Sequence, residues 1–191
     1  MTAVTNLVLV GPMGAGKTSV GKLLAKKLSL NFLDSDKELE SRCGADIPWI
    51  FDIEGESGFR ARETEILAEL STNSGILLAT GGGAVTSEKN RQLIRGAGIV
   101  VYLSATADQI YQRVRHDSGR PLLQVDNPRV AIEDILKKRE PLYREVADLV
   151  IPSSERETAS SMAVAVCAKI EEQFPNKFLF FEEPRIEKAD P

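Results

Sequence analysis

Short apolar runs recur along the chain and are separated by longer segments in which apolar and polar residues mix. The runs are rich in Val, Ile and Leu and do not alternate with polar residues, which is typical of parallel strands buried on both faces of a sheet. The predicted strands are residues 7–10, 31–33, 76–79, 99–103 and 149–151. The pattern is weakest in the second of them.

The segments between these runs carry apolar residues at helical spacing. Residues 20–28 place Val and Leu at i, i+3, i+4 and i+8, which makes one apolar helix face. Similar spacing recurs in three later segments, at Ile66, Leu67 and Leu70, at Ile110 and Val114, and at Ile132, Ile135 and Leu136. The predicted helix N-caps are Thr86 and Thr106, and the predicted helix stops are Gly75 and Gly96.

Strands that alternate with helices indicate an α/β fold. We expect three layers, α/β/α, around a doubly wound sheet of five parallel strands. A single domain over residues 1–174 is expected, with a lid loop at about 113–125 where periodicity is lost, followed by a C-terminal tail over 175–191.

Composition narrows the functional classes. The chain has 191 residues and a formal net charge of −4, so we expect no nucleic-acid partner, and any basic site has to be local. Cys43 and Cys167 lie far apart in the sequence, which favours a reduced cytoplasmic protein and leaves a single disulfide open. We find no pattern of a signal peptide or a transmembrane helix, and expect a cytoplasmic monomer without a membrane partner.

Residues 11–18 read GPMGAGKT, a full match to the phosphate-binding motif G-x-x-x-x-G-K-[ST]. A predicted strand precedes the motif and an amphipathic helix follows it, which disfavours a glycine-rich turn with an incidental lysine. Backbone N–H groups of such a loop point at phosphate oxygens, and the helix N-terminus adds its dipole. Lys17 supplies charge for the β- and γ-phosphates, and the Thr18 hydroxyl suits Mg²⁺. The expected nucleotide-binding residues here are Gly14, Ala15, Gly16, Lys17, Thr18 and Ser19.

Other features separate the classes of protein that carry this loop. The N-K-x-D element of regulatory GTPases is absent from the sequence. AAA-type and helicase ATPases need a longer chain and an apolar strand ending in Asp-Glu, whereas the strand at 76–79 is followed by TGGG. A small kinase, whose second substrate lies over the carboxyl edge of the sheet, fits best. A nucleoside monophosphate kinase stays open on size and topology.

Five further motifs characterise the acceptor side. They are Asp-Ser-Asp at 34–36, GFRARE at 58–63, TGGG at 80–83, GRPLL at 119–123 and REPLY at 139–143. Together with the phosphate loop, in this order and approximate spacing, they resemble the shikimate kinase family over residues 7–158. The resemblance implies the P-loop kinase fold and transfer of the γ-phosphate of ATP, with Mg²⁺, to the 3-hydroxyl of shikimate. The products would be ADP and shikimate 3-phosphate, on the route to chorismate and the aromatic amino acids.

The resemblance also implies roles for individual residues. Asp36 is implied to hydrogen-bond the acceptor hydroxyl and take its proton, and Asp34 to hold Mg²⁺ through water. Arg60 and Arg139 are implied to clamp the carboxylate of shikimate, a task that suits the rigid fork of a guanidinium. Gly82 is implied to contact shikimate.

The lid and the adenine side follow from the same resemblance. Arg120, in the GRPLL motif, is implied to close over the phosphates and neutralise charge on the transferring group, with Arg113 as a helper. Arg156 is implied to lie near adenine, although the residues around it depart from the family pattern. Glu63 is implied to orient Arg60.

Plainer interpretations of these residues stay open on sequence alone. Asp36 could cap the following helix, a common role for Asp. Arg60 and Glu63, three residues apart, could form a helix-surface ion pair. Arg139 lies in a run of charged residues, which by itself does not indicate a function. Residues 81–83 could be a flexible turn, which their position after a buried strand disfavours.

Three functions are therefore compared. Shikimate kinase is the leading hypothesis. A kinase for a related small acid or sugar acid, such as gluconate, also needs an anion clamp, but the joint presence of GFRARE and REPLY disfavours it. An inactive nucleotide-binding module would have no use for the acceptor-side residues.

Overall fold

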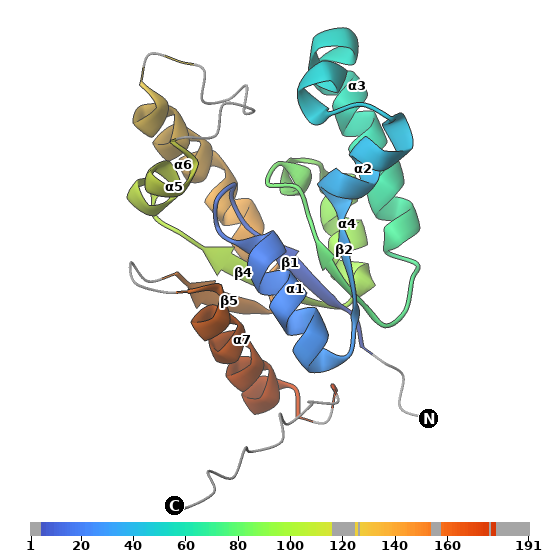
Figure 1. Cartoon of the computed structure of the whole chain (residues 1–191), viewed down its shortest axis with the longest axis vertical. Coiled ribbons are helices and arrows are strands. Elements are labelled where there is room, and N and C mark those ends of the chain that lie inside the picture. The colour runs from blue at the N-terminus through green and yellow to red at the C-terminus, as the bar shows by residue number, and fades with distance from the viewer. Residues whose placement is uncertain (1–4, 116–124, 126, 154–157, 176, 179–191) are drawn as a thin grey trace, which may run out of the picture.

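A five-stranded parallel sheet forms the centre of the molecule in the computed structural model (Figure 1), which describes residues 5–115, 125, 127–153, 158–175 and 177–178. The strands are β1 (Leu7–Val10), β2 (Asn31–Asp34), β3 (Ile76–Ala79), β4 (Ile99–Ser104) and β5 (Leu149–Pro152). Their order in the sheet is β2-β3-β1-β4-β5. The predicted fold class is confirmed, and each predicted strand is present within one residue of its expected bounds.

Helices cover both faces of the sheet (Figure 1). They are α1 (Lys17–Leu28), α2 (Ser35–Cys43), α3 (Ile47–Leu70), α4 (Glu88–Ala97), α5 (Ala107–Val114), α6 (Pro128–Val146) and α7 (Ala159–Gln173), with a short 3₁₀ helix η1 (Ala84–Thr86). The helix α3 contains one break, at Gly55, where φ is 70° and ψ is 179°.

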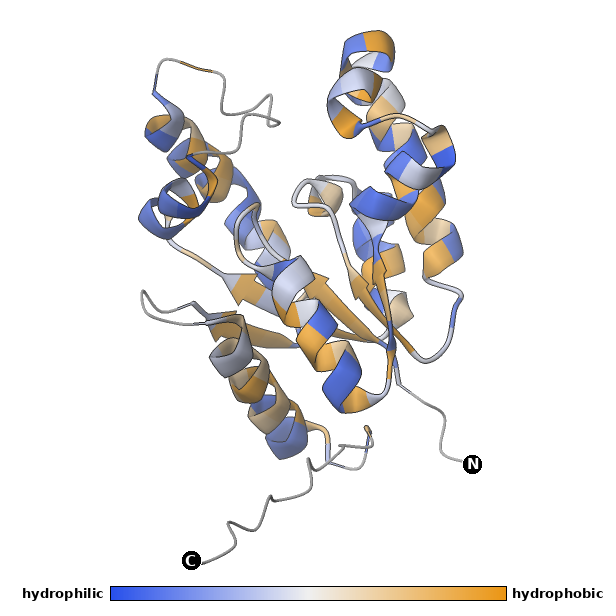
Figure 2. Ribbon diagram, in the orientation of Figure 1, coloured by the Kyte–Doolittle hydropathy of each residue, from blue (hydrophilic) through white to orange (hydrophobic). Residues whose placement is uncertain are grey.

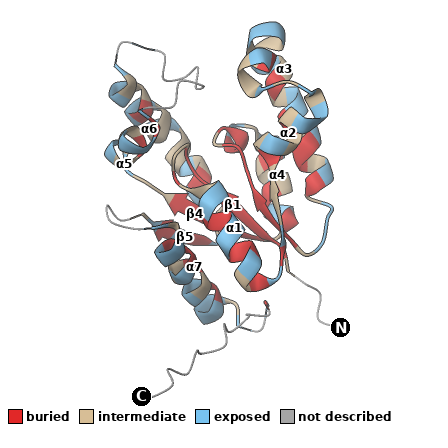
Figure 3. Cartoon of the chain, in the orientation of Figure 1, coloured by how far each residue is buried: buried red, intermediate tan, exposed pale blue. Residues whose placement is uncertain are grey.

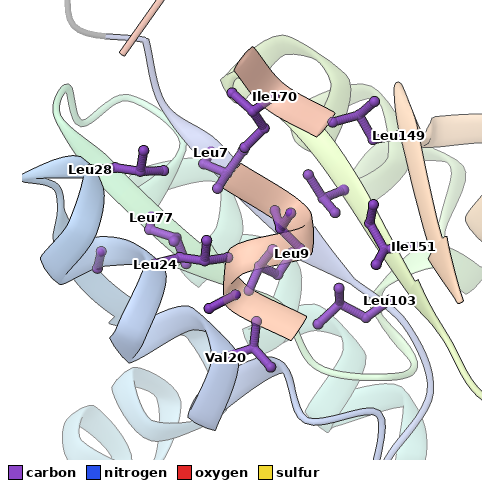
Figure 4. Close-up of a cluster of buried hydrophobic side chains, with 14 of the residues drawn as sticks. Leu7, Leu9, Val20, Leu24, Leu28, Leu77, Leu103, Leu149, Ile151 and Ile170 are labelled. Carbon is purple, nitrogen blue, oxygen red and sulfur yellow. The ribbon is translucent and has the colours of Figure 1, made fainter. Parts of the chain in front are cut away.

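The two faces of the sheet bury separate cores. Leu7 and Leu9 of β1 pack towards α1 and α7, whereas Val8 and Val10 pack towards the opposite layer, which contains α3 and α4. All four side chains are fully buried, which explains why β1 reads as an unbroken apolar run. Figure 4 shows side chains of the first core meeting between β1, α1 and α7. Figures 2 and 3 show that the three middle strands, β3, β1 and β4, are strongly apolar and buried.

Several helix boundaries differ from those predicted. Thr106 caps α5 through a full capping box, as predicted, but α4 is capped by Ser87, because Thr86 ends the preceding 3₁₀ helix. Gly96 lies inside α4, and Gly75 lies directly before β3, five residues after the end of α3. Leu23, expected on the apolar face of α1, is 37% exposed.

The remaining expectations concern the cysteines, the tail and the membrane. Cys43 and Cys167 are both free thiols, so the disulfide left open by the sequence is absent. Phe178 packs against the first core, while residues 179–191 lie outside the described part, as does most of the predicted lid loop. No described helix combines the length and apolar character needed to cross a bilayer.

The topology predicts a ligand site at the carboxyl end of β1. This strand lies between β3 and β4, and the chain winds first to one side of it and then to the other. Ligands of such sheets bind beyond the carboxyl ends of the strands at this reversal. In Figure 1 the loop after β1 projects between α2 and α3 on one side and α5 and α6 on the other.

Candidate active site

The loop between β1 and α1 has the backbone of a phosphate cradle. Gly11 and Gly16 have φ of 146° and 92°, values that residues other than glycine rarely adopt. Gly11 also leaves no room for a side chain, because a Cβ there would lie 2.5 Å from the carbonyl oxygen of Leu103. Helix α1 begins at Lys17 directly after the loop, so the positive end of its dipole faces the loop. Gly14, Ala15 and Gly16 are the three loop residues directly before this helix N-terminus.

Lys17 and Thr18 lie at the start of α1. The Nζ of Lys17 donates hydrogen bonds to the carbonyl oxygens of Gly11 and Pro12, at 2.8 and 2.9 Å. The ammonium group is therefore held over the phosphate loop. Thr18 and Ser19 are exposed at the same helix end.

Asp34 connects the phosphate loop to α2. Its Oδ2 accepts a hydrogen bond of 2.8 Å from the Thr18 hydroxyl. Its Oδ1 accepts from the backbone N–H of Asp36 and Lys37, at 3.2 and 3.4 Å, so Asp34 is the N-cap of α2. The interpretation of Asp36 as the cap is therefore wrong, and the side chain of Asp36 is available for another role.

The Asp36 carboxyl group lies in a crowded, largely desolvated environment. Burial and then the Asp34 carboxylate raise its pKa to about 6, while Lys17 acts in the opposite direction. A Cβ added to Gly81 would lie 2.5 Å from Asp36 Oδ1 and 2.9 Å from Glu63 Oε1, so only glycine fits between the two carboxyl groups. Asp36 is thus expected to change protonation state near pH 6, which suits a group that handles the proton of a hydroxyl.

Arg60 and Glu63 form an ion pair inside the site. The guanidinium Nη1 of Arg60 lies 2.8 Å from Glu63 Oε2, and Glu63 is only 2% exposed. Burial raises the pKa of Glu63, against the opposing effect of Arg60. The contact is compatible with both interpretations given above, an ion pair three residues apart on a helix and a Glu63 that orients Arg60. Since the Glu63 side chain is buried, the contact is more than a solvated surface pair.

Arg139 reaches the same region from α6. Its Nη1 donates to the carbonyl oxygen of Gly82 at 3.3 Å, and the hydroxyl of Tyr143 donates to that oxygen at 2.5 Å. The Arg60 guanidinium lies close to Gly83, since a Cβ added there would lie 2.5 Å from its Nη1. The two arginines therefore flank the Gly82–Gly83 peptide from two different helices.

The three consecutive glycines at 81–83 also approach the phosphate loop. A Cβ added to Gly82 would lie 3.2 Å from the backbone nitrogen of Met13. Gly81 is fixed from the other side, because its N–H donates to the buried Ser35 hydroxyl at 3.0 Å. A single short backbone segment thus joins the phosphate loop to the arginine pair.

Other predicted basic residues differ in their positions. Arg113 of α5 donates to the carbonyl oxygen of Gly14 at 3.1 Å and to the Ser153 hydroxyl at 2.8 Å, so it contacts the phosphate loop. Arg120 and Arg156 lie outside the described residues.

Two contacts of the site were not predicted from the sequence, those of Ser35 and Tyr143. Both residues lie inside motifs that the sequence singled out, Asp-Ser-Asp and REPLY. Their partners lie 46 and 61 residues away in the chain. Only the folded chain brings these partners together, so no local pattern could have identified the contacts.

The residues that suit a magnesium ion are Thr18 and Asp34, which meet beside the phosphate loop. In the described part of the chain, no three or more His, Cys, Asp or Glu side chains gather as a metal-binding group. Mg²⁺ commonly binds through one or two protein oxygens together with substrate phosphates and water. The hydroxyl and carboxylate oxygens of these two residues fit that mode.

Comparison with known proteins identifies the family. The family model described as "Shikimate kinase" matches residues 13–171. A shikimate kinase of Pseudomonas paraeruginosa is 56% identical over 151 residues, which are 79% of this chain and 88% of the relative. The chain belongs to the shikimate kinase family. A family member from Pasteurella multocida is 52% identical over 162 residues, 84% of this chain and 92% of the relative.

A solved structure of the family supports the fold. The shikimate kinase of Acinetobacter baumannii, determined in complex with shikimate, is 48% identical to this chain and superposes with a TM-score of 0.87. The match covers 91% of this chain and 97% of the other. The shikimate kinase fold therefore extends over nearly the whole of the described structure.

Proposed function

We propose that this chain transfers the γ-phosphoryl group of ATP to the 3-hydroxyl of shikimate, giving ADP and shikimate 3-phosphate, as a cytoplasmic monomer. One observation carries the proposal: Gly82 contacts the phosphate loop at Met13 and accepts a hydrogen bond from Arg139. A guanidinium group suited to bind an anion is thereby held next to the phosphate loop. The family membership of the chain supports the same reaction.

The nucleotide side uses the phosphate loop. The N–H groups of the loop and of the first turn of α1 would hold the β- and γ-phosphates, and Lys17 would leave its two carbonyl partners to bind them. Thr18 and Asp34 would hold Mg²⁺, which supplies charge neutralisation of the phosphates when bound. Arg120 at the transferring group and Arg156 near adenine stay predictions from the sequence.

The acceptor side uses Asp36 and the two arginines. Arg60 and Arg139 would bind the carboxylate of shikimate between them, which fixes the ring in one orientation. The Asp36 carboxylate would accept a hydrogen bond from the attacking hydroxyl and align it for in-line transfer. Positioning by these groups, together with charge stabilisation on the nucleotide side, would account for most of the catalysis, since a loose transition state needs little covalent assistance.

An acceptor panel tests the proposal. ADP release is measured with purified protein, Mg²⁺-ATP and either shikimate, gluconate or a nucleoside monophosphate, under identical conditions. We expect shikimate to be turned over far faster than the others and far above the ATPase rate without acceptor. Turnover of shikimate no faster than that background would contradict the proposal, and preference for gluconate would assign the chain to the alternative kinase.

Replacing Arg139 by Ala is expected to raise the KM for shikimate by about 10- to 100-fold, with a much smaller effect on kcat. The reason is that Arg139 would bind a carboxylate remote from the reacting atoms, and a charge-assisted hydrogen bond contributes about 1.5–3 kcal/mol. Arg144→Ala is the matched control, because Arg144 lies on the same helix and forms an ion pair with Glu140, four residues earlier. Equal KM values for the two variants would remove Arg139 from the clamp.

A further inference from the structure

Helix α6 brings two side chains to one acceptor. Arg139 and Tyr143, four residues apart and hence on one helix face, both donate to the carbonyl oxygen of Gly82. The bond from the Tyr143 hydroxyl is the shorter, at 2.5 Å against 3.3 Å. The catalytic roles proposed above make no use of this buried phenol.

The ring of Tyr143 is fixed on its other sides. It is 1% exposed and stacks on Tyr102 of β4, which is equally buried, with ring centroids 5.0 Å apart and an angle of 24° between the planes. A phenol buried in this way requires a hydrogen-bond partner. Burial raises the pKa of Tyr143 above its ordinary value, so the hydroxyl remains a donor at physiological pH. The hydroxyl of Tyr143 is therefore a rigid anchor for the Gly82 carbonyl.

Anchoring this carbonyl orients a whole peptide. The carbonyl of Gly82 and the N–H of Gly83 belong to one planar unit, and glycine itself imposes little conformational preference. Gly83 lies so close to the Arg60 guanidinium that an added Cβ would clash with it, while the Gly82 carbonyl accepts a hydrogen bond from the Arg139 guanidinium. The orientation of this one peptide thus sets the surroundings of both arginines.

We propose that Tyr143 is a positioning residue for substrate binding, which fixes the Gly82–Gly83 peptide and thereby holds Arg60 and Arg139 at the spacing that a carboxylate requires. The inference rests on the proposed function, because it concerns the site assigned above to the carboxylate of shikimate. Tyr143 touches neither reacting group, and its effect is transmitted through backbone and arginines.

The test compares Tyr143→Phe with Tyr102→Phe. Each variant removes one hydroxyl from the same stacked pair. The charged groups that affect the pKa of Tyr102 are Glu140 and Arg144. We expect Tyr143→Phe to raise the KM for shikimate about three- to tenfold, with kcat and the KM for ATP near the wild-type values. Tyr102→Phe is expected to leave all three unchanged. Unfolding temperatures of both variants report whether the fold is retained.

A masked substrate separates positioning from a general loss of structure. With the methyl ester of shikimate, which lacks the charged carboxylate, the difference between Tyr143→Phe and wild type is expected to disappear. In a double-mutant cycle, the effects of Tyr143→Phe and Arg139→Ala are expected to be non-additive, because both act on one binding group.

Failure of this inference differs from failure of the proposed function. If the wild-type chain phosphorylates shikimate but Tyr143→Phe leaves its KM unchanged, or raises the KM for the ester equally, the positioning role is wrong and the function stands. If the wild-type chain does not phosphorylate shikimate, both are overturned.

Discussion

Replacing Lys17 by Ala is expected to reduce kcat by about 100-fold or more, the scale observed when one preorganised electrostatic group is lost. Lys17 is a basic side chain that the fold holds over the phosphate loop, through the carbonyl groups of Gly11 and Pro12. Without the Lys17 ammonium group, the negative charge on the transferring phosphoryl group and its leaving oxygen would be less stabilised in the transition state. Initial rates with saturating shikimate and varied ATP measure the effect.

A matched control for this variant is Lys22→Ala. Lys22 lies on the exposed side of the same helix, five residues further on. It is expected to retain wild-type kcat, and both variants are expected to keep a cooperative unfolding transition. A Lys17→Ala enzyme with near-native kcat would refute the role assigned to this lysine.

Replacing Asp36 by Asn is expected to reduce kcat by about 100-fold, the scale for loss of a proton-handling group. The variant is nearly isosteric, so an effect would report the charge and not the volume of the side chain. The pKa of about 6 predicts the pH dependence as well. Since the carboxylate is the active form, kcat/KM for shikimate should fall as the pH drops below about 6 in the wild type.

The same variant has an opposite effect on stability. The pKa of Asp36 in the folded chain, about 6, lies above its ordinary value of 3.8, so the folded state holds this proton more tightly than the unfolded state. The free energy of unfolding contributed by this group therefore falls as the pH rises from about 4 to about 6 and stays low above that range. Asp36→Asn, which carries no such charge, should unfold at a higher temperature than wild type at pH 8.

Two results would contradict this account of Asp36. One is an unchanged acidic limb in the pH profile of Asp36→Asn, which would assign the limb to another group. The other is a lower unfolding temperature of the variant at pH 8, which would mean that the carboxylate stabilises the folded chain.

Most of the architecture could be predicted because its signals are local. A parallel strand buried on both faces must be apolar throughout, and β1 and β3 were identified from that property with their observed bounds. The phosphate loop is a continuous motif whose glycines adopt conformations that few other residues could. These features depend on neighbours in the sequence, so the sequence specifies them directly.

The fine structure of the site could not be predicted because it depends on contacts between distant segments. Asp34 and Asp36 are equally suitable N-caps by residue type, and only the start of α2 at Ser35 decides between them. The meeting of Arg139, Tyr143 and Gly82 needs α6 to lie beside the segment that follows β3, more than 50 residues away in the chain. The burial of Glu63 likewise follows from packing and not from its spacing to Arg60.

The most direct test of the central claim is a crystal structure of the chain with ADP and shikimate bound. The account predicts that Arg60 and Arg139 both contact the carboxylate of shikimate, that the 3-hydroxyl lies within hydrogen-bond distance of Asp36, and that Lys17 contacts the β-phosphate of ADP. Shikimate bound elsewhere, or with its carboxylate turned away from both arginines, would contradict the account.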